Sequence, residues 1–140
     1  MTTQKSTNDK SLKLTCIKIL IIEDNPICAS TLKSLLQSLG PFDITIASTG
    51  TEALKLFSEN FYLIITDFNL PDMNGIEITK YYRTIFPKKD TPIICCSTDI
   101  EKIRRECIEA GMDDFLSKPV TAEDVEEMLA CWIPRFIRKS

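Results

Sequence analysis

The segment from Phe61 to Gly75 constrains the fold more than any other part of the chain. It begins with the apolar run FYLIIT, which ends at Asp67, and Phe68 leads into the turn-forming sequence NLPDMNG. A continuous apolar run between turn residues is typical of a strand buried on both faces, as in a parallel sheet covered by helices. Because burying an unpaired carboxylate costs several kcal/mol, Asp67 must face a polar pocket at the carboxyl end of this strand.

Strand and helix patterns alternate along the chain. Apolar, often β-branched runs predict five strands, at residues 17–22, 44–47, 61–67, 92–96 and 114–117. Apolar residues at helical spacing predict the helices, at residues 26–39, about 50–57, 75–86, 98–111 and from 121 onward. Strand–helix repeats with short links require parallel pairing and right-handed crossovers. The sequence therefore predicts an α/β fold with a doubly wound, five-stranded parallel sheet.

Three of these helices begin with a capping signal. Asn25 is the expected N-cap of the first helix. Thr98, with Glu101 three positions later, has the form of a capping box. Thr121 and Asp124 mark the start of the last helix in the same way.

Length and charge limit the possible classes. The chain has 140 residues and a formal charge of −3. This length fits one domain, which we expect at residues 15–134, between a disordered polar tail at 1–14 and a short C-terminal tail at 135–140. The negative charge without a basic stripe argues against nucleic-acid binding. No apolar run reaches the roughly 20 residues of a membrane span, so we expect a cytoplasmic protein.

The cysteines predict no disulfide framework and no zinc site. Histidine is absent and no two cysteines are spaced as Cys-x-x-Cys, which leaves almost no ligands for zinc. A chain of this length can form a core without disulfides. We expect buried, reduced thiols at all six positions, Cys16, Cys28, Cys95, Cys96, Cys107 and Cys131.

Polar residues end four of the predicted strands. Glu23 and Asp24 follow the first strand, Asp67 the third, Ser97 the fourth and Lys118 the fifth. In a doubly wound sheet the carboxyl ends of the strands form the ligand-binding edge. We therefore expect these five side chains to lie close together.

This set of side chains suits phosphoryl chemistry. Carboxylates in close contact repel by about 4 kcal/mol per pair at an effective dielectric of about 20, so a cation must lie among them. Oxygen ligands without imidazole or thiolate favour Mg²⁺. Lys118 and Ser97 can stabilise phosphoryl oxygens, and the Asp67 carboxylate can act as a nucleophile that forms an acyl phosphate.

The same residues resemble a known family. Glu23-Asp24 after an apolar strand, Asp67 within TDFNLPDMNG, Ser97 after PIICC, and the sequence FLSKP ending at Pro119 together resemble the CheY-like receiver domain of bacterial response regulators. The likeness runs from about residue 17 to 132. It implies a flavodoxin-like (βα)5 fold with strand order 2-1-3-4-5.

The resemblance implies a role for each site residue. Asp67 would be the phosphoacceptor, and Mg²⁺ would be bound by Asp24 directly, by Glu23 mostly through water, by Asp67 and by the backbone carbonyl of Asn69. Lys118 would pair with one phosphoryl oxygen, and Ser97 would hydrogen-bond another.

The resemblance also implies a switch and an output surface. Phe115 would turn inward as Ser97 moves toward the phosphoryl group, and a downstream protein would bind the helix at 98–111, the strand at 114–117 and the helix from 121. Phe115 stands where tyrosine is also common in this family, so no hydroxyl is available there. Asn69, Thr98 and Asp99 flank the site and should tune hydrolysis, with Thr98 narrowing the access of water.

The favoured function is a phosphorylation switch that receives its phosphoryl group from a histidine kinase or a histidine phosphotransfer protein. Such a domain catalyses only its own phosphorylation and dephosphorylation and is otherwise no enzyme. It can stand alone or belong to a hybrid sensor kinase. Two alternatives are a small aspartyl-phosphate phosphohydrolase, although haloacid-dehalogenase-type phosphatases need a second aspartate where Asn69 stands, and a non-phosphorylated docking module.

Overall fold

Parallel strands form the centre of the protein in a computed structural model that describes residues 17–133. Within these residues the sheet has five strands in the order β2-β1-β3-β4-β5, which confirms the predicted fold class. The strands are β1 (Lys18–Ile22), β2 (Asp43–Ala47), β3 (Leu63–Asp67), β4 (Ile93–Ser97) and β5 (Asp114–Ser117). The predicted tails at 1–14 and 135–140, and Cys16, lie outside the described residues.

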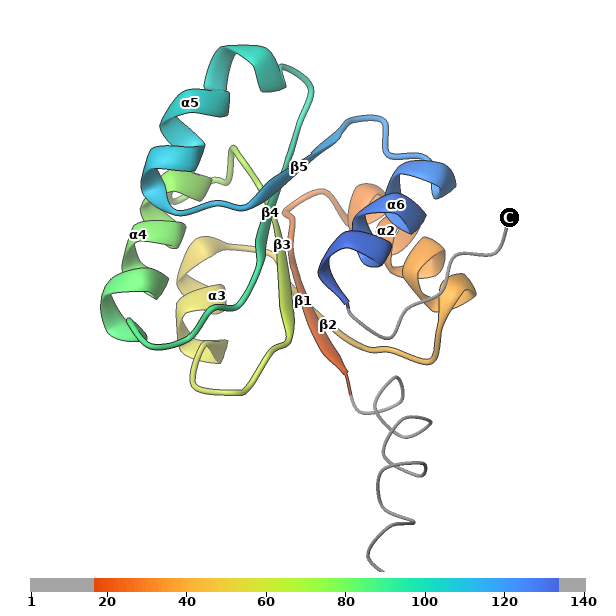
Figure 1. Ribbon diagram of the computed structural model, residues 1–140, viewed down its shortest axis with the longest axis horizontal. Coiled ribbons are helices and arrows are strands. Elements are labelled where there is room, and N and C mark those ends of the chain that lie inside the picture. The colour runs from red at the N-terminus through yellow and green to blue at the C-terminus, as the bar shows by residue number, and fades with distance from the viewer. Residues whose placement is uncertain (1–16, 134–140) are drawn as a thin grey trace, which may run out of the picture.

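Helices cover both faces of the sheet. They are α2 (Pro26–Leu39), α3 (Gly50–Leu56), α4 (Gly75–Ile85), α5 (Ile100–Ala110) and α6 (Ala122–Trp132). Figure 1 shows α2 and α6 on one face, and α3, α4 and α5 on the other. Among the helices at residues 17–133, none combines the length and apolar character needed to cross a membrane.

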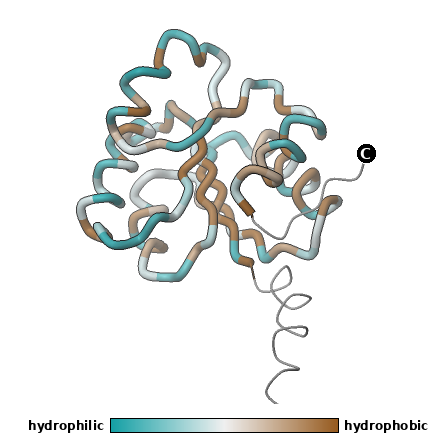
Figure 2. Tube along the Cα trace, viewed as in Figure 1, coloured by the Kyte–Doolittle hydropathy of each residue, from teal (hydrophilic) through white to brown (hydrophobic). Residues whose placement is uncertain are grey.

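Two apolar clusters fill the space between the sheet and its helices. Successive strand residues point to opposite faces, so Ile19 and Ile21 of β1 pack with α2 and α6, whereas Leu20 and Ile22 pack with α3, α4 and α5. The inner strands are accordingly apolar at nearly every position, as Figure 2 shows for the centre of the protein. This explains why the run before Asp67 is continuous rather than alternating.

The strand register brings the carboxyl ends of four strands to one edge of the sheet. Ile22 at the end of β1 pairs with Thr66 of β3, Asp67 pairs with Cys96 of β4, and Ser97 pairs with Ser117 of β5. The residues that follow these four strands therefore lie side by side along this edge of the sheet.

The capping predictions are confirmed at two helices and wrong at the third. Asn25 accepts hydrogen bonds from the N–H groups of Ile27 and Cys28 at the start of α2, and Thr121 accepts one from Asp124 at the start of α6. Thr98 and Glu101 form no capping box. The N-cap of α5 is Asp99, which makes no side-chain cap hydrogen bond, so the N-cap lies one residue later than predicted and Thr98 lies outside the helix.

The loop after β3 is held by caps at two helices. Asn74 and Glu77 form a capping box at the start of α4, which the sequence analysis missed. Asp72 accepts hydrogen bonds from the N–H groups of Gly50 and Thr51 and from the Thr51 hydroxyl. The bond from that hydroxyl, followed by those from the two N–H groups, lowers the pKa of Asp72 to about 2.

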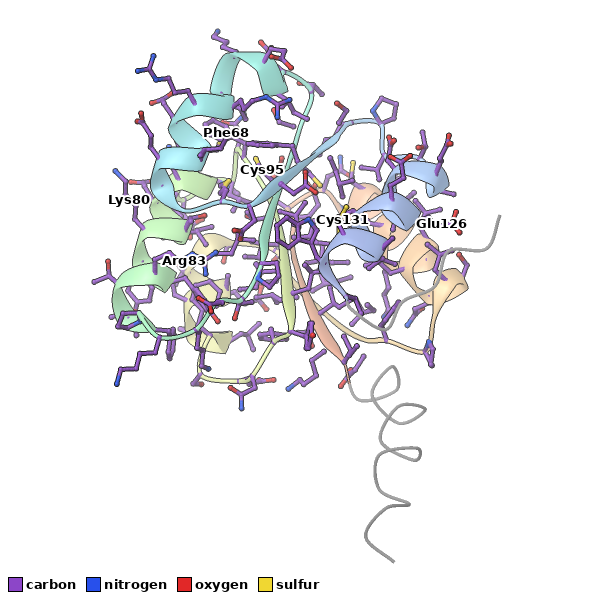
Figure 3. All side chains as sticks on the ribbon, in the orientation of Figure 1. Phe68, Lys80, Arg83, Cys95, Glu126 and Cys131 are labelled. Carbon is purple, nitrogen blue, oxygen red and sulfur yellow. The ribbon has the colours of Figure 1, made fainter. Side chains whose placement is uncertain are left out.

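The prediction that all the cysteines are buried is wrong for two of them. Cys95, Cys96 and Cys107 are buried, but Cys28 on α2 and Cys131 on α6 are exposed. Figure 3 shows Cys95 within the sheet and Cys131 on α6. The five cysteines at residues 17–133 are free thiols, and burial raises the pKa of Cys96 to about 12.

Replacing Tyr82 by phenylalanine should destabilise the fold. The Tyr82 hydroxyl lies 2.7 Å from the Thr91 hydroxyl, and both residues are buried. Removing one partner leaves the Thr91 hydroxyl unsatisfied, so we expect a loss of about 1–2 kcal/mol in the free energy of unfolding, measured by chemical denaturation. Tyr81→Phe is the control, because Tyr81 is exposed. Equal losses in the two variants would contradict this account.

Candidate functional site

Three carboxylates meet at the edge where the strands end. Glu23 and Asp24 follow β1, and Asp67 is the last residue of β3. One carboxylate oxygen from each residue lies within 4.8 Å of the other two. Glu23 is buried, Asp67 is partly buried and Asp24 is exposed. The prediction that these acids come together is confirmed by their geometry.

Lys118 bridges two of these carboxylates. Its Nζ lies 2.8 Å from Oε1 of Glu23 and 3.1 Å from Oδ1 of Asp67. The backbone N–H of Lys118 donates a hydrogen bond to the carbonyl of Ser97, which continues the pairing of β5 with β4 by one residue. The pairing of β5 with β4 thus brings the Lys118 side chain to Glu23 and Asp67.

The charges at this edge do not balance. Burial, followed by the charge of Glu23, raises the pKa of Asp67, although Lys118 opposes the change. Burial alone would lower the pKa of Lys118, but its hydrogen bonds to Glu23 and Asp67 and their charges outweigh burial and raise it. Three carboxylates share one ammonium group at this edge, so negative charge exceeds positive charge. Such a site favours a further cation.

Glu23 and Asp24 differ in how their carboxylate oxygens are engaged. Oε1 of Glu23 contacts Lys118, and its Oε2 accepts a hydrogen bond of 3.1 Å from the N–H of Asn25. Both oxygens of Glu23 are thus engaged, whereas Asp24 is exposed to solvent. The sequence analysis identified Asn25 only as a helix cap, and no sequence signal indicated that its backbone also orients Glu23.

Ser97 lies at the same edge, at the end of β4. It is buried, and its hydroxyl oxygen accepts a hydrogen bond of 3.1 Å from the N–H of Asp99. A hydroxyl that accepts one hydrogen bond can still donate its own proton. Thr98 and Asp99 are exposed on the loop that follows Ser97.

The loop after Asp67 is fixed close to the strand. Asn69 forms an antiparallel bridge with Asn74, and the N–H of Gly75 donates a hydrogen bond of 2.8 Å to the carbonyl of Phe68. Asn69 is exposed two positions after Asp67. Figure 3 labels Phe68, the residue between them.

Phe115 lies on β5 and is partly buried against the cluster formed with α3, α4 and α5. The guanidinium carbon of Arg104 on α5 is 4.9 Å from the centre of its ring. Nothing in the sequence distinguishes Arg104, because its spacing on α5 is that of any exposed helical residue.

Comparison with known proteins shows the class to which this chain belongs. The family model of the response regulator receiver domain matches residues 19–130. The chain therefore belongs to the response regulator receiver domain family, whose members are signalling switches of two-component systems.

Individual relatives include both single-domain and larger proteins. The chain is 33% identical over 116 residues to a chemotaxis protein CheY homolog of Campylobacter jejuni, covering 81% of this chain and 89% of that protein. It is 31% identical over 124 residues to the aerobic respiration control sensor protein ArcB of Escherichia coli K12, covering 87% of this chain but only 16% of ArcB. The chain thus spans a small part of the length of that sensor protein.

Solved structures show the same fold. The receiver domain of a sensor histidine kinase from Pseudomonas aeruginosa PAO1, with a magnesium ion coordinated in its active site cleft, has a TM-score of 0.76 at 28% identity, covering 85% of this chain and 98% of that chain. Chemotaxis protein CheY4 of Vibrio cholerae also has a TM-score of 0.76, at 30% identity, covering 84% and 99%.

Proposed function

We propose that Asp67 accepts a phosphoryl group in a Mg²⁺-dependent reaction and that this modification switches the binding of a downstream protein. The observation that carries the proposal is the cluster of Glu23, Asp24 and Asp67 around the Lys118 ammonium group. The donor is a histidine kinase or a histidine phosphotransfer protein, because receiver domains work in two-component systems. Histidine kinases take this phosphoryl group from ATP, which supports a cytoplasmic location for the domain.

The residues fit a magnesium ion. Carboxylate and carbonyl oxygens are the ligands that Mg²⁺ prefers, and the site has an excess of negative charge. Asp24, Asp67 and the carbonyl of Asn69 would bind the ion, with Glu23 contributing mostly through water because its oxygens are engaged by Lys118 and Asn25. When bound, the ion neutralises charge on the phosphoryl oxygens.

The protein side chains have separate tasks in the transfer. A carboxylate oxygen of Asp67 attacks the phosphorus atom, a new P–O bond forms and the P–N bond to the donor histidine breaks. The electron pair of that bond stays on the imidazole nitrogen. Lys118 pairs with a phosphoryl oxygen in place of the Asp67 oxygen that it contacts here, and Ser97 donates its hydroxyl proton to another. Asn69, Thr98 and Asp99 control the access of water that later hydrolyses the acyl phosphate.

The change then reaches the surface formed by α5, β5 and α6. As Ser97 moves toward the phosphoryl group, Phe115 turns inward and alters this surface, which binds the downstream protein. A cavity of about 210 Å³ beside Lys118, on the face of the sheet covered by α2 and α6, is lined by Ile27 and Leu32 of α2 and by Val120. Ile27 is 74% exposed, which supports docking of the donor protein here.

Incubation with acetyl phosphate tests this proposal. We expect the intact mass to rise by one phosphoryl group when Mg²⁺ is present, no rise when EDTA replaces it, and loss of the adduct on treatment with hydroxylamine, which cleaves acyl phosphates. No adduct, or an adduct that survives hydroxylamine, would count against phosphorylation of an aspartate. Rapid multiple turnover of p-nitrophenyl phosphate would instead indicate a phosphohydrolase.

A further inference from the structure

Strand β5 connects the surface of the domain to its acidic site. Phe115 lies on this strand three positions before Lys118, whose ammonium group contacts Glu23 and Asp67. The strand is the last in the sheet order and pairs with β4, where Phe115 lies opposite Cys95. A contact that holds the Phe115 side chain therefore acts on the same strand that positions Lys118 beside the carboxylates.

The backbone of β5 is anchored next to Phe115. The N–H of Phe115 donates a hydrogen bond of 2.8 Å to Oδ1 of Asp114. Oδ2 of Asp114 accepts a hydrogen bond of 2.7 Å from Nε1 of Trp132 on α6. The ring of Phe115 is only partly buried. The part of this residue with freedom to move is therefore the side chain.

Arg104 lies over that side chain. Its guanidinium carbon is 4.9 Å from the ring centre, within the distance of about 6 Å at which a cation is attracted to an aromatic face. A salt bridge of 3.1 Å to Glu101 holds the guanidinium from its own helix. Arg104 and Phe115 line a cavity of about 300 Å³ between α5, β5 and α6, together with Asp114 and Met128. The ring thus lies between the core and an arginine that faces an open groove.

We propose that Arg104 is a positioning residue that holds Phe115 in the conformation seen here and thereby opposes phosphorylation of Asp67. This inference rests on the proposed function, in which Phe115 turns inward after phosphorylation. A contact made in only one of two states shifts their equilibrium by its own free energy. For a half-exposed cation over an aromatic ring this shift is roughly two- to fivefold. By linkage, a partner that draws Arg104 into the groove would favour the phosphorylated state.

Beryllofluoride, which mimics a phosphoryl group on aspartate, tests the inference. We expect the Arg104→Gln variant to bind beryllofluoride in the presence of Mg²⁺ roughly two- to fivefold more tightly than the unchanged protein, measured by isothermal titration calorimetry. Arg104→Lys, which keeps a cation over the ring, should fall between them. Arg105→Gln is the matched control, because Arg105 lies on the same helix, is 92% exposed and pairs with Glu109. Arg105→Gln removes the same positive charge and should leave the affinity for beryllofluoride unchanged.

Repeating the Arg104→Gln substitution in a protein that lacks the Phe115 ring distinguishes an effect of the Arg104–Phe115 contact from a general effect of charge or stability. In the Phe115→Leu protein, Arg104→Gln should change the affinity no further. The inference is overturned if Arg104→Gln leaves the affinity equal or lower, if Arg105→Gln produces the same gain, or if the gain persists without the ring. If the unchanged protein binds no beryllofluoride, the proposed function itself fails and this inference with it. Binding without a gain in Arg104→Gln removes the inference alone.

Discussion

The Asp67→Asn variant should take up no detectable phosphoryl group from acetyl phosphate, however high the Mg²⁺ concentration. The amide has no anionic oxygen to attack phosphorus and is a poorer ligand for a hard cation. Asparagine has nearly the same shape, so the fold should persist. Because burial and the charge of Glu23 raise the pKa of Asp67, the neutral side chain also removes a repulsion. Intact mass after incubation measures the uptake.

Two other carboxylates provide controls for this experiment. Asp72→Asn is the same chemical change on the loop after β3, at a side chain that caps α3, and it should be phosphorylated normally. Asp24→Asn keeps the acceptor but loses a ligand, so its phosphorylation should weaken and recover as Mg²⁺ is raised. Labelling of Asp67→Asn at the level of the unchanged protein would reject Asp67 as the acceptor.

The Lys118→Met variant should show two opposite effects. Phosphoryl transfer from acetyl phosphate should slow by roughly 10²–10³-fold, because a preorganised positive charge on the phosphoryl oxygens is lost. Mg²⁺ should bind roughly tenfold more tightly, because a cation that contacts Glu23 and Asp67 no longer repels it. The rate is measured by intact mass over time, and the affinity by calorimetric titration of the metal-free protein.

The stability of the same variant should depend on the metal. Without Mg²⁺, the removal of Lys118 leaves two largely buried carboxylates without a cation, which should cost about 3 kcal/mol in the free energy of unfolding. Saturating Mg²⁺ should restore most of this loss. Lys80→Met is the control, since Lys80 is exposed on α4 (Figure 3). Weaker Mg²⁺ binding in Lys118→Met would show that Lys118 does not compete with the ion.

The fold and the site edge could be predicted because they depend on the order of residues along the strands. The apolar run before Asp67 and the four polar strand ends define a parallel sheet with one chemical edge, and strand register brings Glu23, Asp67 and Lys118 together. The site residues that could be predicted from the sequence are those that stand at, or directly after, the end of a strand.

Features that depend on how the helices are rotated and where they begin could not be predicted. Cys28 follows a helical apolar pattern, yet its side of α2 faces solvent. The turn after Ser97 moves the start of α5 past Thr98, although the local sequence fits a capping box. Arg104 contacts Phe115 from another element, and such contacts depend on tertiary packing that spacing along one helix does not report.

The hydrogen bonds of Asp114 also bear on self-association. An outer strand of a sheet presents backbone N–H and carbonyl groups to which a strand of another molecule can add. At β5 the N–H of Phe115 is taken by the adjacent Asp114 carboxylate, which is itself held by Trp132. One of the donors that an incoming chain would need is therefore occupied, and a negative charge stands beside it. This arrangement disfavours edge-to-edge aggregation on the side of the sheet where we propose that the downstream protein binds.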